Sequence, residues 1–192
     1  MKVGVIAVQG AFREHIRVLR ELGADAVEVR RANELEGADA VVLPGGESTA
    51  IGKLMRTYDL IEPVKKLANE GKPVFGTCAG MIVLAKHIAG EDTVHLGLMD
   101  VEVNRNSFGR QRESFEADLD FPALGDKPYP AVFIRAPHIQ SVGKDAEVLA
   151  TYDDRIVAVR QGNLLATSFH PELTGDTRLH EYFLGLGEQK RS

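Results

Sequence analysis

The first half of the chain alternates short apolar runs with amphipathic segments, and this alternation constrains the fold more than any other feature. Residues 2–8 (KVGVIAV) are nearly all apolar, as expected of a strand that is covered on both faces. Residues 11–22 follow with apolar side chains at helical spacing, and Gly23 is expected to end that helix. The alternation continues through the strand-like DAVEVRR, ADAVVLP and KPVFGT and the helical LIEPVKKLANEG and AGMIVLAKHI. This pattern predicts a mostly parallel sheet with helices on both faces.

The second half of the chain has a different pattern. Short strand-like runs recur, separated by turn residues: DVEVNR, SFEADL, AVFIRA, EVLATYD, RIVAVRQG and NLLATSF. Because no long helical segment separates them, we expect antiparallel strands added to the parallel core. A last helix is expected over DTRLHEYFLGLG, and the polar stretch RNSFGRQRESFE is expected to be a loop near a site or interface, or simply a solvated loop.

Length and charge narrow the class of protein. A chain of 192 residues suits one sizeable α/β domain, so we expect residues 1–192 to form a single domain. The net charge of −5 argues against a nucleic-acid-binding protein, which needs a basic face. The apolar N-terminus is short and is followed by charged residues, which suits a buried strand better than a signal peptide. A single cysteine cannot form an internal disulfide, and the expected location is the cytoplasm.

That cysteine, Cys78, lies between a predicted strand and a predicted helix, with Gly76 two positions before it and Gly80 two positions after it. The spacing matches the G-x-S-x-G nucleophile elbow written with cysteine, in which close backbone packing admits only glycine at the flanking positions. A helix N-terminus also favours a thiolate, and the N–H group of Ala79 is expected to face a developing oxyanion. A small buried cysteine without a catalytic role remains the simpler alternative.

A cysteine nucleophile needs a base and a group that orients the base. Among six histidines, His170 is the best candidate, because it ends a strand-like run and Glu172 follows two residues later. Side chains at i and i+2 of extended backbone share one side, and the intervening proline favours extended geometry at His170. The other histidines are weaker candidates. His15, His87 and His180 fall in helical patterns and are expected on amphipathic faces, His95 in a turn, and His138 in a loop without an adjacent acid.

Tandem glycines follow the third strand-like run, in VVLPGGEST. We expect Gly45 or Gly46 to supply a second oxyanion donor at the carboxyl edge of the sheet, with Glu47 and Ser48 holding a polar substrate. A helix cap formed by Ser48 or Thr49 is an alternative that is compatible with this role. A phosphate-binding loop is rejected, because one residue too many separates the glycines of GESTAIGKL and leucine replaces the required Ser or Thr.

These elements, in this order, resemble the class I (triad) glutamine amidotransferases, and one subfamily in particular, the glutaminase subunit of pyridoxal 5'-phosphate synthase. The resemblance covers essentially the whole chain. It rests on VIAVQGAFREH, LPGGESTAIG, GTCAGM, NRNSFGRQRESFE, VFIRAPHI and SFHPEL. The fold that it implies is a flavodoxin-like three-layer α/β fold with a central, mostly parallel sheet, helices on both faces and added antiparallel strands.

The resemblance implies an activity. Cys78 attacks the side-chain amide of L-glutamine, His170 accepts the thiol proton and passes it to the leaving ammonia, and Glu172 orients His170. Water then hydrolyses the thioester to glutamate. The oxyanion is expected against N–H groups of Gly46 and Ala79. Contacts with glutamine are expected from Gly46, Glu47, Ser48, Arg105, Ile134 and Arg135. An arginine suits the substrate α-carboxylate, although each arginine is equally compatible with a structural ion pair.

The resemblance also implies a partner: a synthase subunit that receives the ammonia within a large hetero-oligomer. We expect Gln9 at that interface, coupling docking to activity, and we expect the chain itself to bind neither pyridoxal phosphate nor a metal. Three alternatives remain: another cysteine hydrolase on a flavodoxin-like sheet, the amidotransferase subunit of another pathway, and a binding subunit without catalysis. The intact Cys78, His170 and Glu172 argue against the last.

Overall fold

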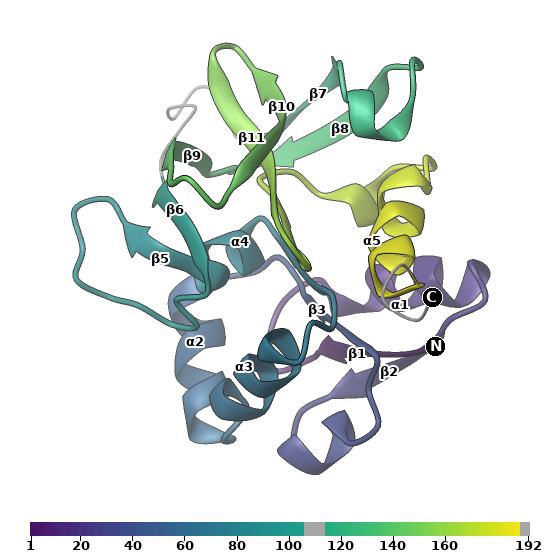
Figure 1. Cartoon of the computed structure of the whole chain (residues 1–192), viewed down its shortest axis with the longest axis vertical. Coiled ribbons are helices and arrows are strands. Elements are labelled where there is room, and N and C mark those ends of the chain that lie inside the picture. The colour runs from purple at the N-terminus through teal and green to yellow at the C-terminus, as the bar shows by residue number, and fades with distance from the viewer. Residues whose placement is uncertain (106–113, 189–192) are drawn as a thin grey trace.

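A computed structural model describes residues 1–105 and 114–188 of the chain (Figure 1). The strands are β1 (Lys2–Ile6), β2 (Asp25–Val29), β3 (Ala40–Leu43), β4 (Val74–Thr77), β5 (Ala85–Ile88), β6 (Met99–Asn104), β7 (Ser114–Leu119), β8 (Tyr129–Ile134), β9 (His138–Val142), β10 (Glu147–Tyr152), β11 (Arg155–Gln161) and β12 (Leu164–Thr167). The helices are α1 (Phe12–Glu21), α2 (Ser48–Thr57), α3 (Ile61–Asn69), α4 (Ala79–Leu84) and α5 (Arg178–Glu188), with 3-10 turns η1 (Ala32–Leu35), η2 (Pro122–Leu124) and η3 (Pro171–Leu173).

One large sheet organises the fold, with the strand order β2-β1-β3-β4-β12-β11-β9-β6-β5, and β10 pairs with β11 outside this path. The pairs from β2 through β12 are parallel, whereas β12–β11, β11–β9, β9–β6 and β10–β11 are antiparallel. β7 and β8 form a separate antiparallel pair. The predicted parallel core with added antiparallel strands is therefore confirmed.

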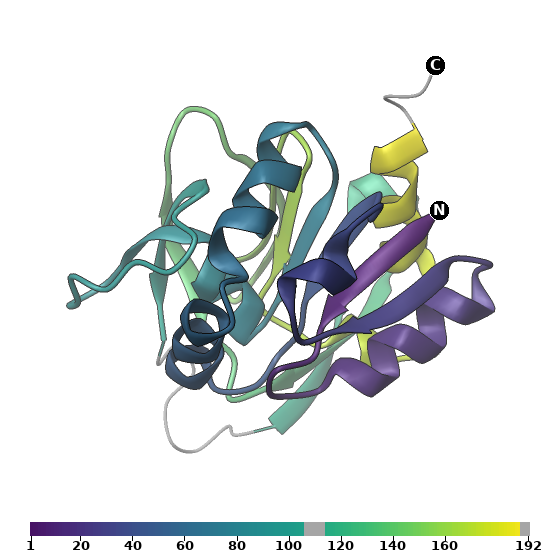
Figure 2. The ribbon, with the colours of Figure 1, turned by 90° about the horizontal axis from the view of Figure 1, so that it is seen from below.

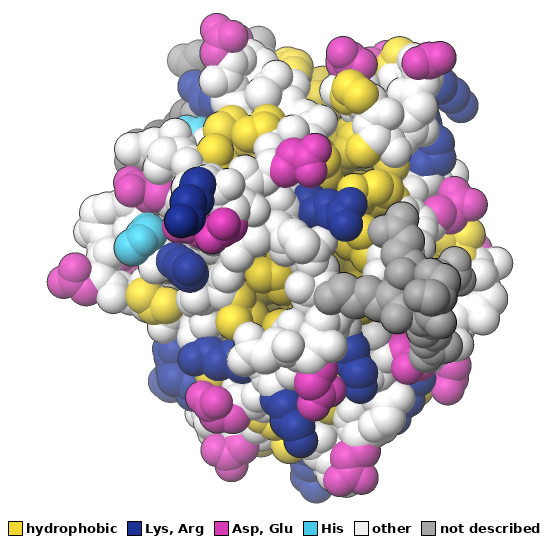
Figure 3. All heavy atoms as spheres, viewed as in Figure 1, with side chains coloured by type: hydrophobic (Ala, Val, Ile, Leu, Met, Phe, Trp, Pro, Cys, Tyr) yellow, Lys and Arg dark blue, Asp and Glu magenta, His cyan; other side chains and the backbone are white. Residues whose placement is uncertain are grey.

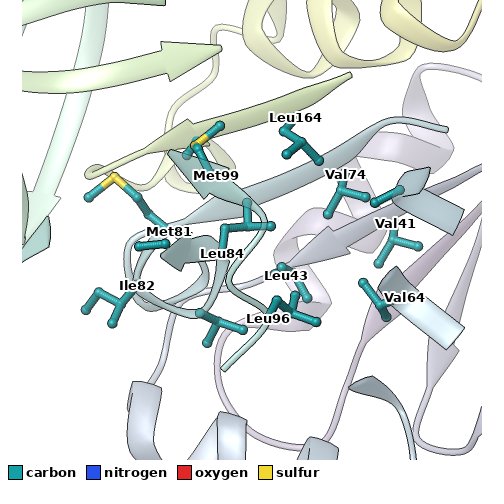
Figure 4. Close-up of a cluster of buried hydrophobic side chains, with 14 of the residues drawn as sticks. Val41, Leu43, Val64, Val74, Met81, Ile82, Leu84, Leu96, Met99 and Leu164 are labelled. Atoms are coloured by element: carbon teal, nitrogen blue, oxygen red, sulfur yellow. The ribbon is translucent and has the colours of Figure 1, made fainter. Parts of the chain in front are cut away.

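The two faces of the parallel strands are both buried, which explains their nearly continuous apolar sequences. Within β4, for example, Val74 belongs to one hydrophobic cluster and the next residue, Phe75, to the other. The first cluster packs against α2, α3 and α4 and is drawn in Figure 4. The second packs against α1 and α5, so that helices cover both faces of the sheet, as Figures 1 and 2 show.

The predicted helix over residues 79–88 is wrong in its second half. α4 ends at Leu84, and the next four residues form β5, which pairs in parallel with β6. Ala85 already has extended backbone, with φ −68° and ψ 142°. Pairing with β6, a partner distant in sequence, overrides the helical pattern that the local sequence favours. By contrast, Gly23 lies just beyond α1 with φ +89°, as the sequence predicts.

β4 and β12 run side by side in the same direction, with Thr77 opposite Thr167. Their carboxyl ends therefore meet at one edge of the sheet, and the residues that follow each strand are neighbours although far apart in sequence. The backbone N–H of Cys78 donates to the carbonyl of Thr167 over 2.8 Å, which extends the pairing into the loop. This pairing brings the two candidate catalytic segments together.

No helix of the described residues has the length and apolarity needed to cross a membrane.

Candidate active site

Cys78 occupies the sharp turn between β4 and α4. Its backbone lies at φ +53° and ψ −109°, a strained conformation for a residue with a side chain. The side chain is mostly buried, and its Sγ lies 3.9 Å from the carbonyl oxygen of Ile134, the last residue of β8. Ala79 begins α4, and the first N–H groups of a helix have no acceptor within it. The geometry is that of a nucleophile elbow.

The two flanking glycines are required by close packing, and neither has a positive φ. A methyl group added at Gly76 would lie 2.5 Å from the carbonyl oxygen of Gly80. One added at Gly80 would collide with the carbonyl oxygen of Leu43 in β3. Close approach of backbone within the elbow itself and from β3 therefore excludes side chains at both positions, as the G-x-C-x-G spacing predicts.

His170 and Glu172 follow β12 and lie beside the elbow. The Nδ1 of His170 is 3.0 Å from Oε1 and 3.2 Å from Oε2 of Glu172, and Glu172 has no exposed surface. The backbone N–H of His170 donates to the carbonyl of Val132 in β8, which fixes the chain at this point. The imidazole also interacts with the side chain of Cys78, which contributes to the raised pKa of His170. The structure thus brings Cys78, His170 and Glu172 together in one chain of contacts.

The charge state of His170 follows from these contacts. Burial opposes the imidazolium, but the interactions of His170 with Cys78 and Glu172 outweigh it and raise the pKa of His170 to about 10. His170 therefore holds a proton at neutral pH. An imidazolium next to a cysteine sulfur stabilises the thiolate, which is the nucleophilic form.

The tandem-glycine loop covers this group of residues. A methyl group added at Gly45 would lie 2.6 Å from Cε1 of His170 and 3.4 Å from Cβ of Cys78. Gly45 also accepts, through its carbonyl, a hydrogen bond of 2.9 Å from the N–H of Ala11. Gly46 has φ +155°, and a methyl group there would collide with Oε1 of Gln9. The loop before α1 and the tandem-glycine loop therefore lie against each other beside Cys78.

Glu47 caps α2, in place of the predicted Ser48 or Thr49. Its carboxylate accepts from the N–H of Thr49 over 3.1 Å and from the N–H of Ala50 over 2.7 Å. Burial of the carboxylate raises its pKa, but these two N–H groups and the charge of Arg105 outweigh that effect and lower the pKa of Glu47 overall. Ser48 is buried in the first turn. The sequence prediction named the wrong capping residue because a glutamate is a less common cap than Ser or Thr.

The predicted substrate-contact residues outside the tandem-glycine loop differ in how close they lie to Cys78. The carbonyl of Ile134 faces Cys78, as noted, and Arg135 follows it with φ +45° on the protein surface. Arg105 is held by Glu91, with Nε 2.8 Å from Oε2, and its guanidinium donates to the hydroxyl of Thr49 over 3.3 Å. Arg105 therefore lies beside the cap of α2. Residues 106–113, most of the predicted polar loop, lie outside the described residues.

His15 and His180, which the sequence analysis placed on amphipathic helix faces, lie in α1 and α5 and are fully buried. Nδ1 of His15 in α1 is 2.9 Å from Nε2 of His180 in α5. Nε2 of His15 is 3.1 Å from Oγ1 of Thr77 and 3.4 Å from Oε2 of Glu172. The sequence does contain a sign that His15 is buried: it lies within the apolar stripe of α1, between Phe12 and Leu19 at helical spacing.

One face of the molecule carries both positive and negative side chains. Figure 3 shows Lys and Arg side chains interspersed with Asp and Glu side chains on the face that it presents. On that face, the described residues form no broad basic surface of the kind that nucleic-acid binding requires.

Comparison with known proteins decides the family. The profile of the SNO glutamine amidotransferase family matches residues 5–188. The chain belongs to this family. It is 61% identical over 186 residues to "Pyridoxal 5'-phosphate synthase subunit PdxT" of Moorella thermoacetica, which covers 97% of this chain and 99% of that protein. The protein of the same name from Geobacillus thermodenitrificans is 57% identical over 192 residues, covering 100% of this chain and 98% of the relative.

A solved structure supports the same relationship. A crystal structure described as a glutamine amidotransferase superposes with a TM-score of 0.92 at 53% identity, over 97% of this chain and 98% of that one. Because the chain belongs to this family, two alternatives from the sequence analysis are not favoured: another cysteine hydrolase, and an amidotransferase subunit of another pathway.

Proposed function

We propose that this chain is a glutaminase that hydrolyses L-glutamine to L-glutamate and ammonia and supplies the ammonia for pyridoxal 5'-phosphate synthesis. One observation supports this function above all: Cys78 on a glycine-flanked elbow contacts His170, which contacts the buried Glu172. This arrangement occurs in a chain of the SNO glutamine amidotransferase family, whose relatives are named as subunits of pyridoxal 5'-phosphate synthase. Residues 1–192 act as one amidotransferase domain in this proposal.

The reaction begins with the thiolate of Cys78 attacking the side-chain amide carbon of glutamine, which forms a C–S bond and an oxyanion. N–H groups of Gly46 and Ala79 stabilise that oxyanion. His170, protonated at the start, gives its proton to the amide nitrogen, the C–N bond breaks, and ammonia leaves. Water then attacks the thioester while His170 takes a proton from it. The C–S bond breaks, glutamate leaves, and the thiolate of Cys78 is restored.

Glu172 has a separate task in this mechanism. Its contact with Nδ1 of His170 directs Nε2 of the imidazole toward the sulfur and stabilises the imidazolium. The proton that the first step needs is therefore already on the histidine, which fits the raised pKa of His170. This differs from the simpler sequence-based expectation, in which His170 takes the thiol proton during the attack.

We assign substrate contacts to residues around the elbow. The assigned residues are Gly46, Glu47, Ser48, Arg105, Ile134 and Arg135. Support comes from the placement of the tandem-glycine loop against His170 and Cys78, and of the Ile134 carbonyl against the sulfur. The positive charge of an arginine at this edge matches the α-carboxylate of glutamine.

The partner is a synthase subunit, and we propose that the two kinds of subunit form a large hetero-oligomer in the cytoplasm. Gln9 lies at their interface and couples docking to activity. Its Oε1 accepts a hydrogen bond of 3.0 Å from the N–H of Glu47. A movement of Gln9 on docking would therefore directly displace the loop that carries Gly46. Ammonia passed between docked subunits does not escape into water, where at neutral pH it is mostly protonated and no longer a nucleophile.

The test is glutamate release from L-glutamine by the purified chain, with and without the synthase subunit. We expect strong stimulation by the partner and no turnover by Cys78→Ala under either condition. Gln9→Ala is expected to reduce stimulation or binding. Activity that ignores the partner would remove support for the pathway, and no activity in either case would refute the glutaminase assignment.

A further inference from the structure

The buried pair formed by His15 and His180 contacts the candidate site from behind. Nε2 of His15 lies 3.4 Å from Oε2 of Glu172 and 3.1 Å from the hydroxyl of Thr77, the residue that precedes the nucleophile. Its other nitrogen, Nδ1, lies 2.9 Å from Nε2 of His180. His15 thus touches the group that orients His170 and the strand that carries Cys78, without facing the substrate side.

Both histidines are neutral at pH 7. Burial lowers the pKa of His15 well below its usual value, and unfavourable interactions with the nearby imidazoles of His180 and His170 lower it further. Burial lowers the pKa of His180 to about 4. The groups that face His15 are His180 from α5, Thr77 from β4, and Glu172 and His170 from the segment after β12. A neutral imidazole has one N–H group and one acceptor nitrogen, so only two arrangements of the pair keep the hydrogen bond between the two rings.

In the first arrangement, Nε2 of His180 donates to Nδ1 of His15, and the proton of His15 is on Nε2, facing Glu172 and Thr77. In the second, His15 donates from Nδ1 to His180. The lone pair of its Nε2 then faces the carboxylate of Glu172. The proton of His180 moves to Nδ1, a buried atom with no hydrogen-bond partner among the described residues. The second arrangement buries an unpaired N–H group and sets the lone pair of His15 Nε2 against the Glu172 carboxylate, whereas the first leaves only an acceptor nitrogen unpaired. The first is therefore favoured.

We propose that His15 is a positioning residue for glutamine hydrolysis: His180 fixes it in the Nε2–H form, and that N–H group holds the Glu172 carboxylate against His170. The expected effect on kcat rests on the proposed glutaminase function. The contacts of His15 and its tautomer do not depend on that function. Glu172 reaches Nδ1 of His170 with both oxygens, at 3.0 and 3.2 Å. The N–H group of His15, 3.4 Å from Oε2, helps to keep both carboxylate oxygens on Nδ1 of His170.

Two substitutions separate positioning from packing. His15→Phe keeps a ring among its aromatic neighbours but removes the donor, and His15→Gln places an amide N–H near the position of Nε2. We expect kcat to fall about 10- to 100-fold in His15→Phe, with a smaller change in KM, as for the loss of other outer hydrogen bonds that orient a catalytic group. His15→Gln is expected to recover most of that loss. His87→Gln, at an exposed position of β5, is the control for histidine replacement in general.

A second measurement needs no activity. Nitrogen NMR of the ¹⁵N-histidine-labelled parent protein is expected to show His15 protonated at Nε2 and not at Nδ1. The pKa of His170 measured in the same way is expected to be lower in His15→Phe than in the parent and in His15→Gln.

The outcomes are distinguishable. Equal activity loss in His15→Phe and His15→Gln, or a parent His15 protonated at Nδ1, overturns the positioning role. A parent protein that shows the expected tautomer but releases no glutamate overturns the proposed function instead. If His15→Phe fails to fold, the tautomer of His15 in the parent protein still tests the positioning role, because a proton on Nδ1 overturns it.

Discussion

The buried His180 is expected to make the protein lose stability as the pH falls. The pKa of His180 is about 4 in the folded protein, against 6.5 when it is unperturbed. Between these values the unfolded chain binds the proton and the folded protein does not, so stability is lost with decreasing pH. The difference in proton binding amounts to about 2 kcal/mol of unfolding free energy between pH 7 and pH 5. The lowered pKa of His15 acts in the same direction.

The assay is urea unfolding at pH 7 and pH 5, followed by far-ultraviolet circular dichroism because the chain has no tryptophan. His180→Gln removes the titrating group and keeps an N–H donor for His15, so its stability is expected to fall less between the two pH values, by about 2 kcal/mol. The raised pKa of His170 contributes with the opposite sign in both proteins and cancels in the comparison. His87→Gln, at an exposed site, should keep the full pH dependence of the parent. An equal loss of stability in the parent and His180→Gln would refute the reasoning.

Further substitutions test the elbow, the helix cap and the orienting carboxylate. Gly80→Ala forces a methyl group against a neighbouring backbone carbonyl and should destabilise the fold by about 3 kcal/mol or more in urea unfolding, whereas Gly185→Ala, which meets open space in α5, should stabilise it by about 1 kcal/mol. Glu47→Ala removes the α2 cap and should cost about 1 kcal/mol, and Glu47→Gln, which keeps an acceptor oxygen, should cost less; equal costs would contradict the capping role. Glu172→Gln should leave the fold intact and slow glutamate release by roughly three orders of magnitude, so near-parental activity would exclude the orienting role.

Features that depend on nearby residues could be predicted from the sequence. The elbow around Cys78 could be predicted because its steric demands fall on Gly76 and Gly80, two positions away in each direction. The pairing of His170 with Glu172 could be predicted from their separation of two residues, but the expected extended backbone is wrong: Pro171–Leu173 form a 3-10 turn, and His170 directly precedes it.

Features that depend on distant residues could not be predicted in this way. The end of α4 at Leu84 is set by pairing of the next residues with β6, which no local pattern records. His15 and His180 fit amphipathic helices, and only the packing of α1 against α5 reveals that both are buried against each other. The same limit applies to Glu47, whose capping role depends on the turn that the tandem-glycine loop makes before α2.

β12 is synthesised after every other described strand, yet it is inserted between β4 and β11. Until it inserts, the edge of β4 has no partner on that side, and Cys78 has neither its histidine nor its glutamate. A nascent chain on the ribosome therefore cannot consume glutamine, and such long-range pairing is expected to fold slowly. In a refolding experiment, the return of glutaminase activity would report this single insertion step, separately from the earlier formation of the helices.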